Sequence, residues 1–365
     1  MKKVKLIALT GFLGAGKTTT MTEISRYLET KGETVAMVTN DQGLGLVDSA
    51  LAALVTEHAA EVTGGCYCCR FDDLSLVLDD LLARGEVTAI VIEAVGSCTD
   101  LQATVIRPLQ KFYGDRIEVA PLMTVVDPAR YDELLADESA IEDSDLSYLF
   151  DLQLREANVI GVNKEDKLDN VQKKGFVAKL KDRYPKAEVI LYSALCKRGI
   201  DSVLKALSGD VKHWNLDVDY DRYAAAEADL AWLNINAELI ARGDSGFLSG
   251  KWVMSVLGAV GDYCKDKGAT IGHAKIHLAT DTGVANGNLI GDGNPRLVSL
   301  VESPSHTGKA LVNVRATLDP EELDNLIVKA INEASEEANV DVKTGDSRSF
   351  RPSYPKPTHR IEVES

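Results

Sequence analysis

The chain has no apolar run of 18 residues, few aromatic residues (6%) and fewer bases than acids. The missing run excludes an ordinary membrane-spanning helix. Residues 6–13 imitate the apolar part of a secretory signal, but glycines and Lys17 follow without a cleavage site. Forty Lys and Arg stand against 56 Asp and Glu, and a net charge of −16 disfavours nucleic acid and anionic membranes as partners. We therefore expect a protein that binds neither.

Cysteine is also scarce, and its distribution is uneven. Six cysteines in 365 residues are too few for a disulfide framework. Three of them, Cys66, Cys68 and Cys69, fall within four residues, which indicates reduced, metal-binding thiols. The sequence therefore predicts a cytoplasmic protein. Its length and its 45% hydrophobic content predict a globular chain with two domains.

Residues 1–207 alternate short apolar runs with longer amphipathic segments. This pattern predicts an α/β domain, in which a mostly parallel, doubly wound sheet carries crossover helices on both faces. Ligands of such sheets gather at the carboxyl ends of the strands. The predicted strands are residues 4–10, 34–39, 88–92, 117–126, 158–162 and 188–192.

The rest of the chain has a different pattern. Residues 208–229 are acidic and aperiodic, which predicts a linker, and residues 230–340 predict a smaller α+β domain of the split βαβ kind. Residues 341–365 are expected to be a flexible or docked tail. His273 and His277 lie on a predicted strand, about 13 Å apart, and are expected to be solvated rather than to share an ion. The expected elements are strands at 233–239, 274–279, 297–301 and 311–317 and helices at 249–267 and 320–336.

A phosphate-binding loop is the strongest motif. Residues 11–18 match G-x-x-x-x-G-K-[ST] between a predicted strand and a predicted helix. The glycines let backbone N–H groups surround phosphates, Lys17 reaches the β and γ phosphates, and the Thr18 hydroxyl is a ligand for Mg²⁺. The predicted nucleotide-binding residues here are Gly11, Gly14, Ala15, Gly16, Lys17, Thr18 and Thr19.

A second motif selects the base. Asn163, Lys164 and Asp166 follow a predicted strand, and the Asp166 carboxylate is suited to accept two hydrogen bonds from guanine. Adenine lacks that donor pair, and sites of this kind reject such an analogue by roughly 10⁴ to 10⁵-fold. Ser193 and Ala194, at the end of another predicted strand, are assigned to the same pocket. The sequence therefore predicts binding of GTP and GDP.

Two further segments complete the predicted hydrolytic site. Glu93 ends a strand, where it would organise water around Mg²⁺, and Gly96 would turn its N–H toward the γ phosphate. Asp41 is a candidate for positioning the attacking water. We therefore expect a slow Mg²⁺-dependent GTPase with Lys17, Asp41 and Glu93 as its catalytic residues. A small-molecule kinase is the alternative that the guanine motif disfavours.

The cysteine cluster predicts a transition-metal site. Gly64 and Gly65 permit the turn that brings Cys66, Cys68 and Cys69 to one ion. Three thiolates about 2.3 Å from Zn²⁺ leave one tetrahedral position open, which suits metal transfer. Buried small side chains or a redox pair are the alternatives.

The motifs, taken in their order along the chain, resemble those of the CobW-like GTPases. These are metallochaperone relatives of the urease and hydrogenase maturation GTPases. The resemblance implies that the phosphate loop and Glu93 serve GTP and Mg²⁺ and that the cysteines bind a transition metal, Zn²⁺ first and Co²⁺ or Fe²⁺ as alternatives. It also implies that residues 40–48 form the first switch and that the smaller domain is α+β. It rests on residues 11–19, 40–48, 65–69, 93–96, 125–127 and 163–166.

The chain departs from that family in places. Residues 40–44 read Asn-Asp-Gln-Gly-Leu instead of Asn-Glu-Phe-Gly-Glu, and the histidine-rich stretch of many members is absent. Ser97 and Cys98 replace Leu-Ala, which adds a fourth thiol beside the second switch, where it is a candidate to complete the site in one nucleotide state.

Two functions follow from these motifs. One is a metallochaperone that couples GTP state to metal delivery, because the cysteine loop lies between the two switches in sequence. The other is a GTPase that docks on and activates a corrinoid or other metalloenzyme, with structural cysteines. Both imply an unidentified client metalloprotein, and a homo-oligomer is left open.

Overall fold

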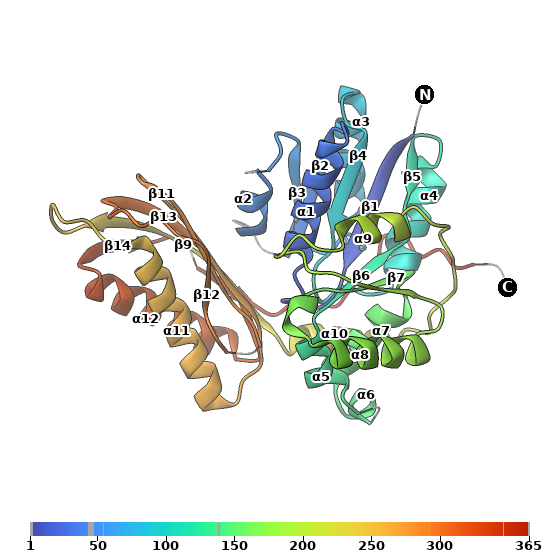
Figure 1. Ribbon diagram of the computed structural model, residues 1–365. Helices are drawn as coiled ribbons and strands as arrows, with labels where there is room; N and C mark the ends of the chain where they lie inside the picture. Colours follow the sequence, from blue (N-terminus) through green and yellow to red (C-terminus); the bar gives the residue numbers. More distant parts are fainter. Residues whose placement is uncertain are drawn as a thin grey trace. The chain divides into compact units, whose positions relative to one another are not determined.

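The computed structural model describes residues 3–42, 47–53, 55–137, 139–291, 293–345 and 347–363, and they form two compact units (Figure 1). The first unit contains the described residues of Met1–Gln42, Leu51–Ala226 and Tyr354–Ser365. The second contains those of Gly43–Ala50 and Glu227–Ser353. Among the described helices, none is both long enough and apolar enough to cross a bilayer.

The first unit is built on a parallel sheet, eight-stranded over the described residues. Its order is β3-β2-β4-β1-β6-β7-β8, and β5 pairs with β1. The predicted α/β fold is thus confirmed, and the carboxyl ends of β1, β2 and β4 meet at one edge of the sheet. The strands are β1 (Val4–Thr10), β2 (Val35–Asp41), β3 (Ala59–Thr63), β4 (Ala89–Glu93), β5 (Ile117–Val119), β6 (Met123–Val126), β7 (Val159–Val162) and β8 (Glu188–Leu191).

Helices connect these strands and close the core of the first unit. Asp127 caps α5 through the amide of Ala129, and Asp169 caps α8 in a capping box with Gln172. Ile7, Val91 and Val125 lie fully buried on central strands. The helices are α1 (Lys17–Thr30), α3 (Phe71–Arg84), α4 (Arg107–Tyr113), α5 (Pro128–Leu135), α6 (Ala140–Asp143), α7 (Asp145–Arg155), α8 (Asn170–Arg183) and α9 (Ile200–Ala206), with short helices η1 (Gln102–Ile106) and η2 (Glu165–Lys167). Two further helices cross a boundary of the division: α2 (Val47–Ala53) belongs to the second unit up to Ala50, and α10 (Tyr220–Ala228) belongs to the first unit up to Ala226.

The sheet of the first unit differs from the expectation in two places. The single strand predicted at 117–126 is two strands, β5 and β6, which pair in succession with β1. Pro121 lies between them, and its missing N–H cannot continue a ladder. The prediction also missed β3, whose five residues include the exposed Glu61 and show little apolar pattern.

The second unit is a two-layer α+β structure. Its sheet, seven-stranded in the part of the chain that the structure describes, has the order β12-β11-β10-β13-β9-β14, with β15 on β9. Because β13 is antiparallel to both β9 and β10, it splits the β9-α11-β10 unit, which confirms the split βαβ prediction. The elements are β9 (Ala231–Ala241), α11 (Ser249–Lys267), β10 (Ile271–Thr280), β11 (Gly283–Leu289), β12 (Arg296–Ser299), β13 (Thr307–Ala316), α12 (Pro320–Glu337), β14 (Val340–Thr344) and β15 (Arg348–Phe350).

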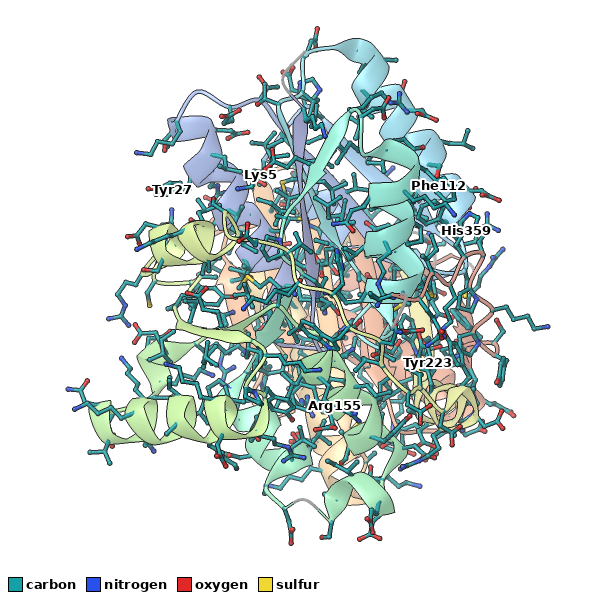
Figure 2. All side chains as sticks on the ribbon, turned by 90° about the vertical axis from the view of Figure 1, so that its right-hand side faces the viewer. Lys5, Tyr27, Phe112, Arg155, Tyr223 and His359 are labelled. Atoms are coloured by element: carbon teal, nitrogen blue, oxygen red, sulfur yellow. The ribbon has the colours of Figure 1, made fainter. Side chains whose placement is uncertain are left out.

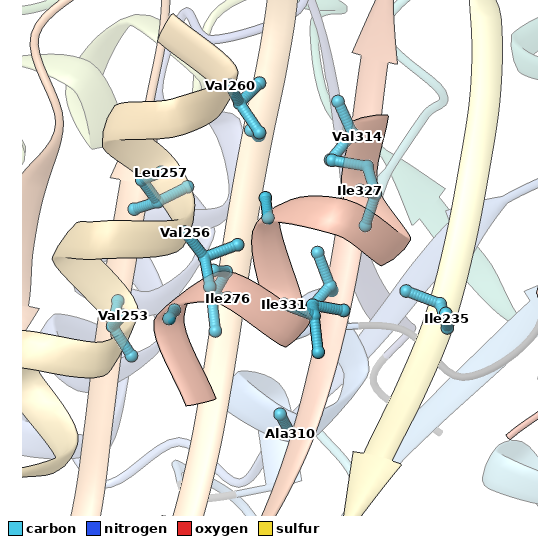
Figure 3. Close-up of a cluster of buried hydrophobic side chains, with 14 of the residues drawn as sticks. Ile235, Val253, Val256, Leu257, Val260, Ile276, Ala310, Val314, Ile327 and Ile331 are labelled. Atoms are coloured by element: carbon cyan, nitrogen blue, oxygen red, sulfur yellow. The ribbon is translucent and has the colours of Figure 1, made fainter. Parts of the chain in front are cut away.

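Both long helices of this unit pack on one face of its sheet (Figure 3). Val256 and Val260 of α11 and Ile331 of α12 are fully buried, as are Ile276 and Val314 of the strands. Each such side chain contributes about 1.5–3 kcal/mol by leaving water. The helical periodicity of both segments is what made them predictable.

His273 and His277 correct an expectation. Both lie on β10, as predicted for a strand, but they are 6% and 8% exposed rather than solvated. The ring of His277 is hydrogen-bonded through Nδ1 to Oδ1 of Asn286 on the neighbouring strand, 2.7 Å away. β10 has a paired strand on each side, so its polar side chains are covered by those of its neighbours. The alternation of polar and apolar residues in the sequence does not reveal this burial.

Candidate nucleotide and metal site

The loop between β1 and α1 has the backbone that a phosphate site requires. Gly11, Gly14 and Gly16 have φ angles of 129°, 78° and 95°, in the region that favours glycine. A Cβ on Gly11 would lie 2.2 Å from the carbonyl oxygen of Val125. The loop thus keeps its amides free of side chains, as anion binding at a helix N-terminus demands.

Lys17 and Thr18 begin α1 and are both buried. Lys17 donates from Nζ to the carbonyl oxygen of Gly11 at 2.8 Å, so its ammonium lies across the loop. Thr18 donates from Oγ1 to Oε1 of Glu93 at 3.0 Å. A hydroxyl and a carboxylate side by side form the oxygen set that Mg²⁺ prefers, so these residues fit that ion. Thr19 is exposed.

The base motif lies against the same loop. Asn163 donates from Nδ2 to the carbonyl oxygen of Ala15 at 3.0 Å, and its Oδ1 accepts from the amide of Ala194 at 3.0 Å. Lys164 donates from Nζ to the carbonyl oxygen of Gly14 at 2.9 Å. Asp166 is exposed on η2. Two of the three motif residues therefore brace the loop, while Asp166 faces solvent.

The remaining predicted nucleotide residues lie at strand ends. Ser193 is buried, and its Oγ accepts from the amide of Cys196 at 3.1 Å. Asp41 is half-buried at the end of β2. Gly96 packs so closely on Leu13 of the loop that a Cβ would lie 2.6 Å from its Cδ2. Residues 43–46 of the predicted first switch lie outside the described residues.

The second switch has a support that the sequence did not reveal. Gln153 on α7 donates from Nε2 to the carbonyl oxygens of Gly96 and Cys98, 2.9 Å to each. Its side chain is fully buried. A buried glutamine on an otherwise apolar helix face was the only available signal.

The three predicted metal ligands form one cluster. Gly64, with φ of 79°, turns the chain after β3, and the amide of Cys69 donates to the carbonyl oxygen of Cys66 at 3.0 Å. The sulfurs of Cys66, Cys68 and Cys69 all lie within 4.8 Å of one another. The Sγ of Cys68 is 2.8 Å from that of Cys66 and 3.8 Å from that of Cys69. Cys66 and Cys68 are buried, and Cys69 is half-buried.

The surroundings of these thiols raise their pKa values. Contacts with the other thiols, and then burial, raise the pKa of Cys68 well above its usual value. Contact with Cys66, followed by burial, raises the pKa of Cys69 to about 11. At neutral pH the thiols therefore hold their protons until a cation displaces them.

The predicted first switch is tied directly to the cysteine loop. The buried Asn40 donates from Nδ2 to the carbonyl oxygens of Val62 and Gly65, at 2.9 and 2.8 Å. Its Oδ1 accepts from the amide of Tyr67 at 2.9 Å. Tyr67 is also buried and donates from its hydroxyl to the carbonyl oxygen of Val38 at 2.8 Å. The sequence prediction missed Tyr67, although an aromatic residue between cysteines was a signal.

Residues 354–363, which we call the C-terminal strap, lie along the cysteine loop. The amide of Lys356 donates to Sγ of Cys69 at 3.2 Å, and the amide of Thr358 donates to the carbonyl oxygen of Cys68 at 2.8 Å. Further along, the amide of Ile361 donates to the carbonyl oxygen of Ala103 at 2.8 Å. The strap therefore covers the most exposed thiol of the cluster.

Aromatic contacts secure the same segment. The ring of His359 lies 5.1 Å from that of Phe71 and 5.0 Å from that of Phe112, and Figure 2 shows His359 beside Phe112. Tail composition predicted a flexible or docked segment but did not indicate which residues it would contact.

Sequence comparisons with known proteins find a family and several relatives. The family model "CobW/HypB/UreG, nucleotide-binding domain" matches residues 5–191. "Zinc chaperone YeiR" of Escherichia coli is 29% identical over 162 residues, covering 44% of this chain and 46% of that protein. "Zinc chaperone CobW" of Pseudomonas aeruginosa is 30% identical over 198 residues, covering 46% and 51%. "Zinc-regulated GTPase metalloprotein activator 1" of Schizosaccharomyces pombe is 28% identical over 172 residues, covering 45% and 39%.

The chain thus spans about half the length, or less, of these curated relatives. The family model itself covers just over half of the 365 residues, including the phosphate loop, the cysteine cluster and the base motif. The chain belongs to the CobW/HypB/UreG family, as a CobW-like P-loop GTPase-fold protein.

Proposed function

We propose that the protein is a Mg²⁺-dependent GTPase and metallochaperone that binds a transition metal at Cys66, Cys68 and Cys69 and couples nucleotide state to metal delivery. The observation that carries this proposal is Asn40, whose side chain makes three hydrogen bonds to the segment around the cysteine loop. A movement of the first switch would therefore move the metal ligands.

Each residue of the nucleotide site has a proposed role in GTP binding or hydrolysis. Asp166 would accept hydrogen bonds from guanine, while Asn163 and Lys164 hold the loop under the phosphates. Lys17 would stabilise negative charge on the β and γ phosphates, and Asp41 would position water. Thr18 and Glu93 would hold Mg²⁺, which supplies charge neutralisation at the transferred phosphoryl group.

The proposed metal binding is supported by the thiol cluster and by the names of the relatives. Thiolates suit Zn²⁺, and relatives are named zinc chaperones, so Zn²⁺ is the proposed cargo, with Co²⁺ or Fe²⁺ as alternatives. Binding requires the raised-pKa thiols to lose protons. The recipient would be a client metalloprotein in the cytoplasm.

A second function has one observation in its favour. Cys66 and Cys68 are buried, as expected for a structural ion that never leaves, and one relative is named an activator of metalloproteins. In that case the protein would dock on and activate a client without transferring metal. Transfer of ⁶⁵Zn²⁺ to apo-client proteins separates these functions.

Anaerobic metal titration tests the coupling. Zn²⁺, Co²⁺ and Fe²⁺ are titrated into the full chain with GDP or with a nonhydrolysable GTP analogue. We expect affinities that differ by roughly 5 to 150-fold between nucleotides, and by linkage the metal must change nucleotide affinity by the same factor. Cys68→Ser should abolish tight binding, whereas Cys196→Ser, an exposed cysteine outside the cluster, should not. Metal affinity indifferent to nucleotide would remove the chaperone function.

The GTPase function has its own test. Lys17→Ala should abolish phosphate release from GTP, and the parent protein should prefer GTP to ATP. Equal hydrolysis of both nucleotides, or a fully active Lys17→Ala protein, would contradict the assignment.

A further inference from the structure

We propose that Cys98 is the fourth metal ligand, so that the ion is held by four thiolates and not by three with an open position. This inference rests on the proposed metal binding at the cysteine loop. It adds a ligand from the second switch, a segment outside that loop.

The distance between Cys98 and Cys68 fits a fourth thiolate, although Cys98 lies outside the group of three thiols whose sulfurs are all within 4.8 Å of one another. Zn–S bonds of about 2.3 Å in a tetrahedron place the sulfurs about 3.8 Å apart. The Sγ of Cys98 is 3.6 Å from that of Cys68, and the Sγ of Cys69 is 3.8 Å from it. Cys66, at 2.8 Å from Cys68, has to move away by about 1 Å. The Cys98–Cys68 sulfur distance is thus closer to the ideal spacing than the Cys66–Cys68 distance is, although Cys66 is one of the three predicted ligands.

Two hydrogen bonds hold the backbone of Cys98 in place. Its amide donates to the carbonyl oxygen of Val95 at 3.0 Å, and its carbonyl oxygen accepts from Gln153 at 2.9 Å. Ligands held by such hydrogen bonds are positioned before the ion arrives. Gln153 is a positioning residue here, because it acts through Cys98 and Gly96.

Burial argues against water as the fourth ligand. Cys98 is 0% exposed, Cys66 3% and Cys68 1%, whereas Cys69 is the half-buried thiol of the four. The inner side of the cluster is thus lined by sulfur rather than open to solvent. An ion bound there would exchange with a client thiol on the Cys69 side, beneath the strap.

The position of Cys98 adds a second link to the nucleotide. It lies two residues after Gly96, whose amide is assigned to the γ phosphate. A Cys98–metal bond would therefore join the ion to the second switch, just as Asn40 joins the cysteine loop to the first. Both switches would then be linked to the metal site, so a change of nucleotide at either switch would affect the ligands.

The test counts sulfur ligands in Co²⁺-loaded and Zn²⁺-loaded full-length protein under anaerobic conditions. X-ray absorption should show four sulfurs in the parent protein and three sulfurs plus one oxygen or nitrogen in Cys98→Ser. Thiolate-to-Co²⁺ charge-transfer absorption should fall by about a quarter in the variant, because that absorption scales with the number of thiolates. Cys264→Ser, a buried cysteine of the second unit, is the matched control and should keep four sulfurs.

The outcomes separate this inference from the proposed function. Three sulfurs in both the parent and Cys98→Ser would overturn the fourth ligand, while loss of binding in Cys68→Ser would leave the cysteine loop as the metal site. An unchanged spectrum in Cys68→Ser, or no metal in the parent, would remove both. If Cys98→Ser does not fold, as judged by circular dichroism, Cys98→Ala, which buries no hydroxyl group, answers the same question.

Discussion

Arg360 donates from Nε to Oδ2 of Asp100 at 2.8 Å, and the Asp100 side chain is only 2% exposed. Asp100 has a φ of 59°, unusual for a residue with a side chain, and it also accepts from the hydroxyl of Tyr220 at 2.9 Å. Burial raises the pKa of this carboxyl, and Arg360 opposes the rise. The strap thus supplies the positive charge that a buried acid beside the second switch requires.

Replacing Arg360 by Ala should therefore destabilise the first unit. Breaking a buried pair costs about 3–5 kcal/mol, and the partial exposure of Arg360 reduces this to roughly 1–3 kcal/mol. Urea denaturation measures the loss, and alkylation of Cys69 should become faster as the strap loosens. Arg242→Ala, which removes exposed ion pairs with Glu336 and Asp341, is the control and should cost much less, because water and salt screen exposed pairs. Unchanged Cys69 reactivity in the Arg360 variant would show that the strap does not depend on this pair.

Glu156 should make the protein less stable at alkaline pH. It is fully buried, and burial followed by the charge of Asp100 raises its pKa to about 8, against 4.5 for an ordinary Glu. Between these values the native state holds a proton that the unfolded state lacks, so the free energy of unfolding falls as pH rises and levels off above pH 8.

A neutral replacement shows the effect. Glu156→Gln should unfold at similar urea concentrations to the parent near pH 5 and be more stable than it at pH 9, by on the order of a few kcal/mol. Parallel stability profiles for the two proteins would contradict the raised pKa.

Metal binding should release protons and strengthen as pH rises. Because the pKa values of Cys66, Cys68 and Cys69 are raised, these thiols are protonated at neutral pH and must ionise to ligate. Calorimetry in buffers of different ionisation enthalpy counts the protons released. A heat of binding that does not depend on the buffer would mean that no thiol ionises.

Gly11→Ala should abolish nucleotide binding. The added methyl group meets the Val125 carbonyl oxygen, so the loop has to leave its present backbone path. Gly32→Ala is the control, because Gly32 also has positive φ (86°) but a Cβ there meets nothing within 4 Å. It should cost about 1 kcal/mol of stability from backbone strain and leave binding of fluorescent GDP intact.

The sequence predicted what is encoded locally. The glycines and Lys17 of the phosphate loop, and the periodicity of α11 and α12, reflect rules that act within a few residues. The parallel sheet was predictable because apolar runs alternate with helices. β3, by contrast, is short and has little apolar pattern, and its pairing with β2 is decided by the sheet.

Contacts between distant residues could not be predicted in this way. Gln153 supports Gly96 across 57 residues, and the strap reaches the cysteine loop across 287 residues. Neither contact leaves a periodic signal, because a single hydrogen bond needs only one donor at one place. The sequence marks Cys98 as a candidate ligand, but only the fold gives its distance from Cys68.

The separation between Cys69 and Lys356 also sets an order of events during synthesis. The two residues lie 287 positions apart, so at about 5–20 residues per second the ribosome needs roughly 15–60 s to pass from one to the other. During that interval the thiols have emerged without the segment that covers Cys69. In the nascent chain, therefore, Cys69 cannot be covered by the strap until 287 further residues have been added.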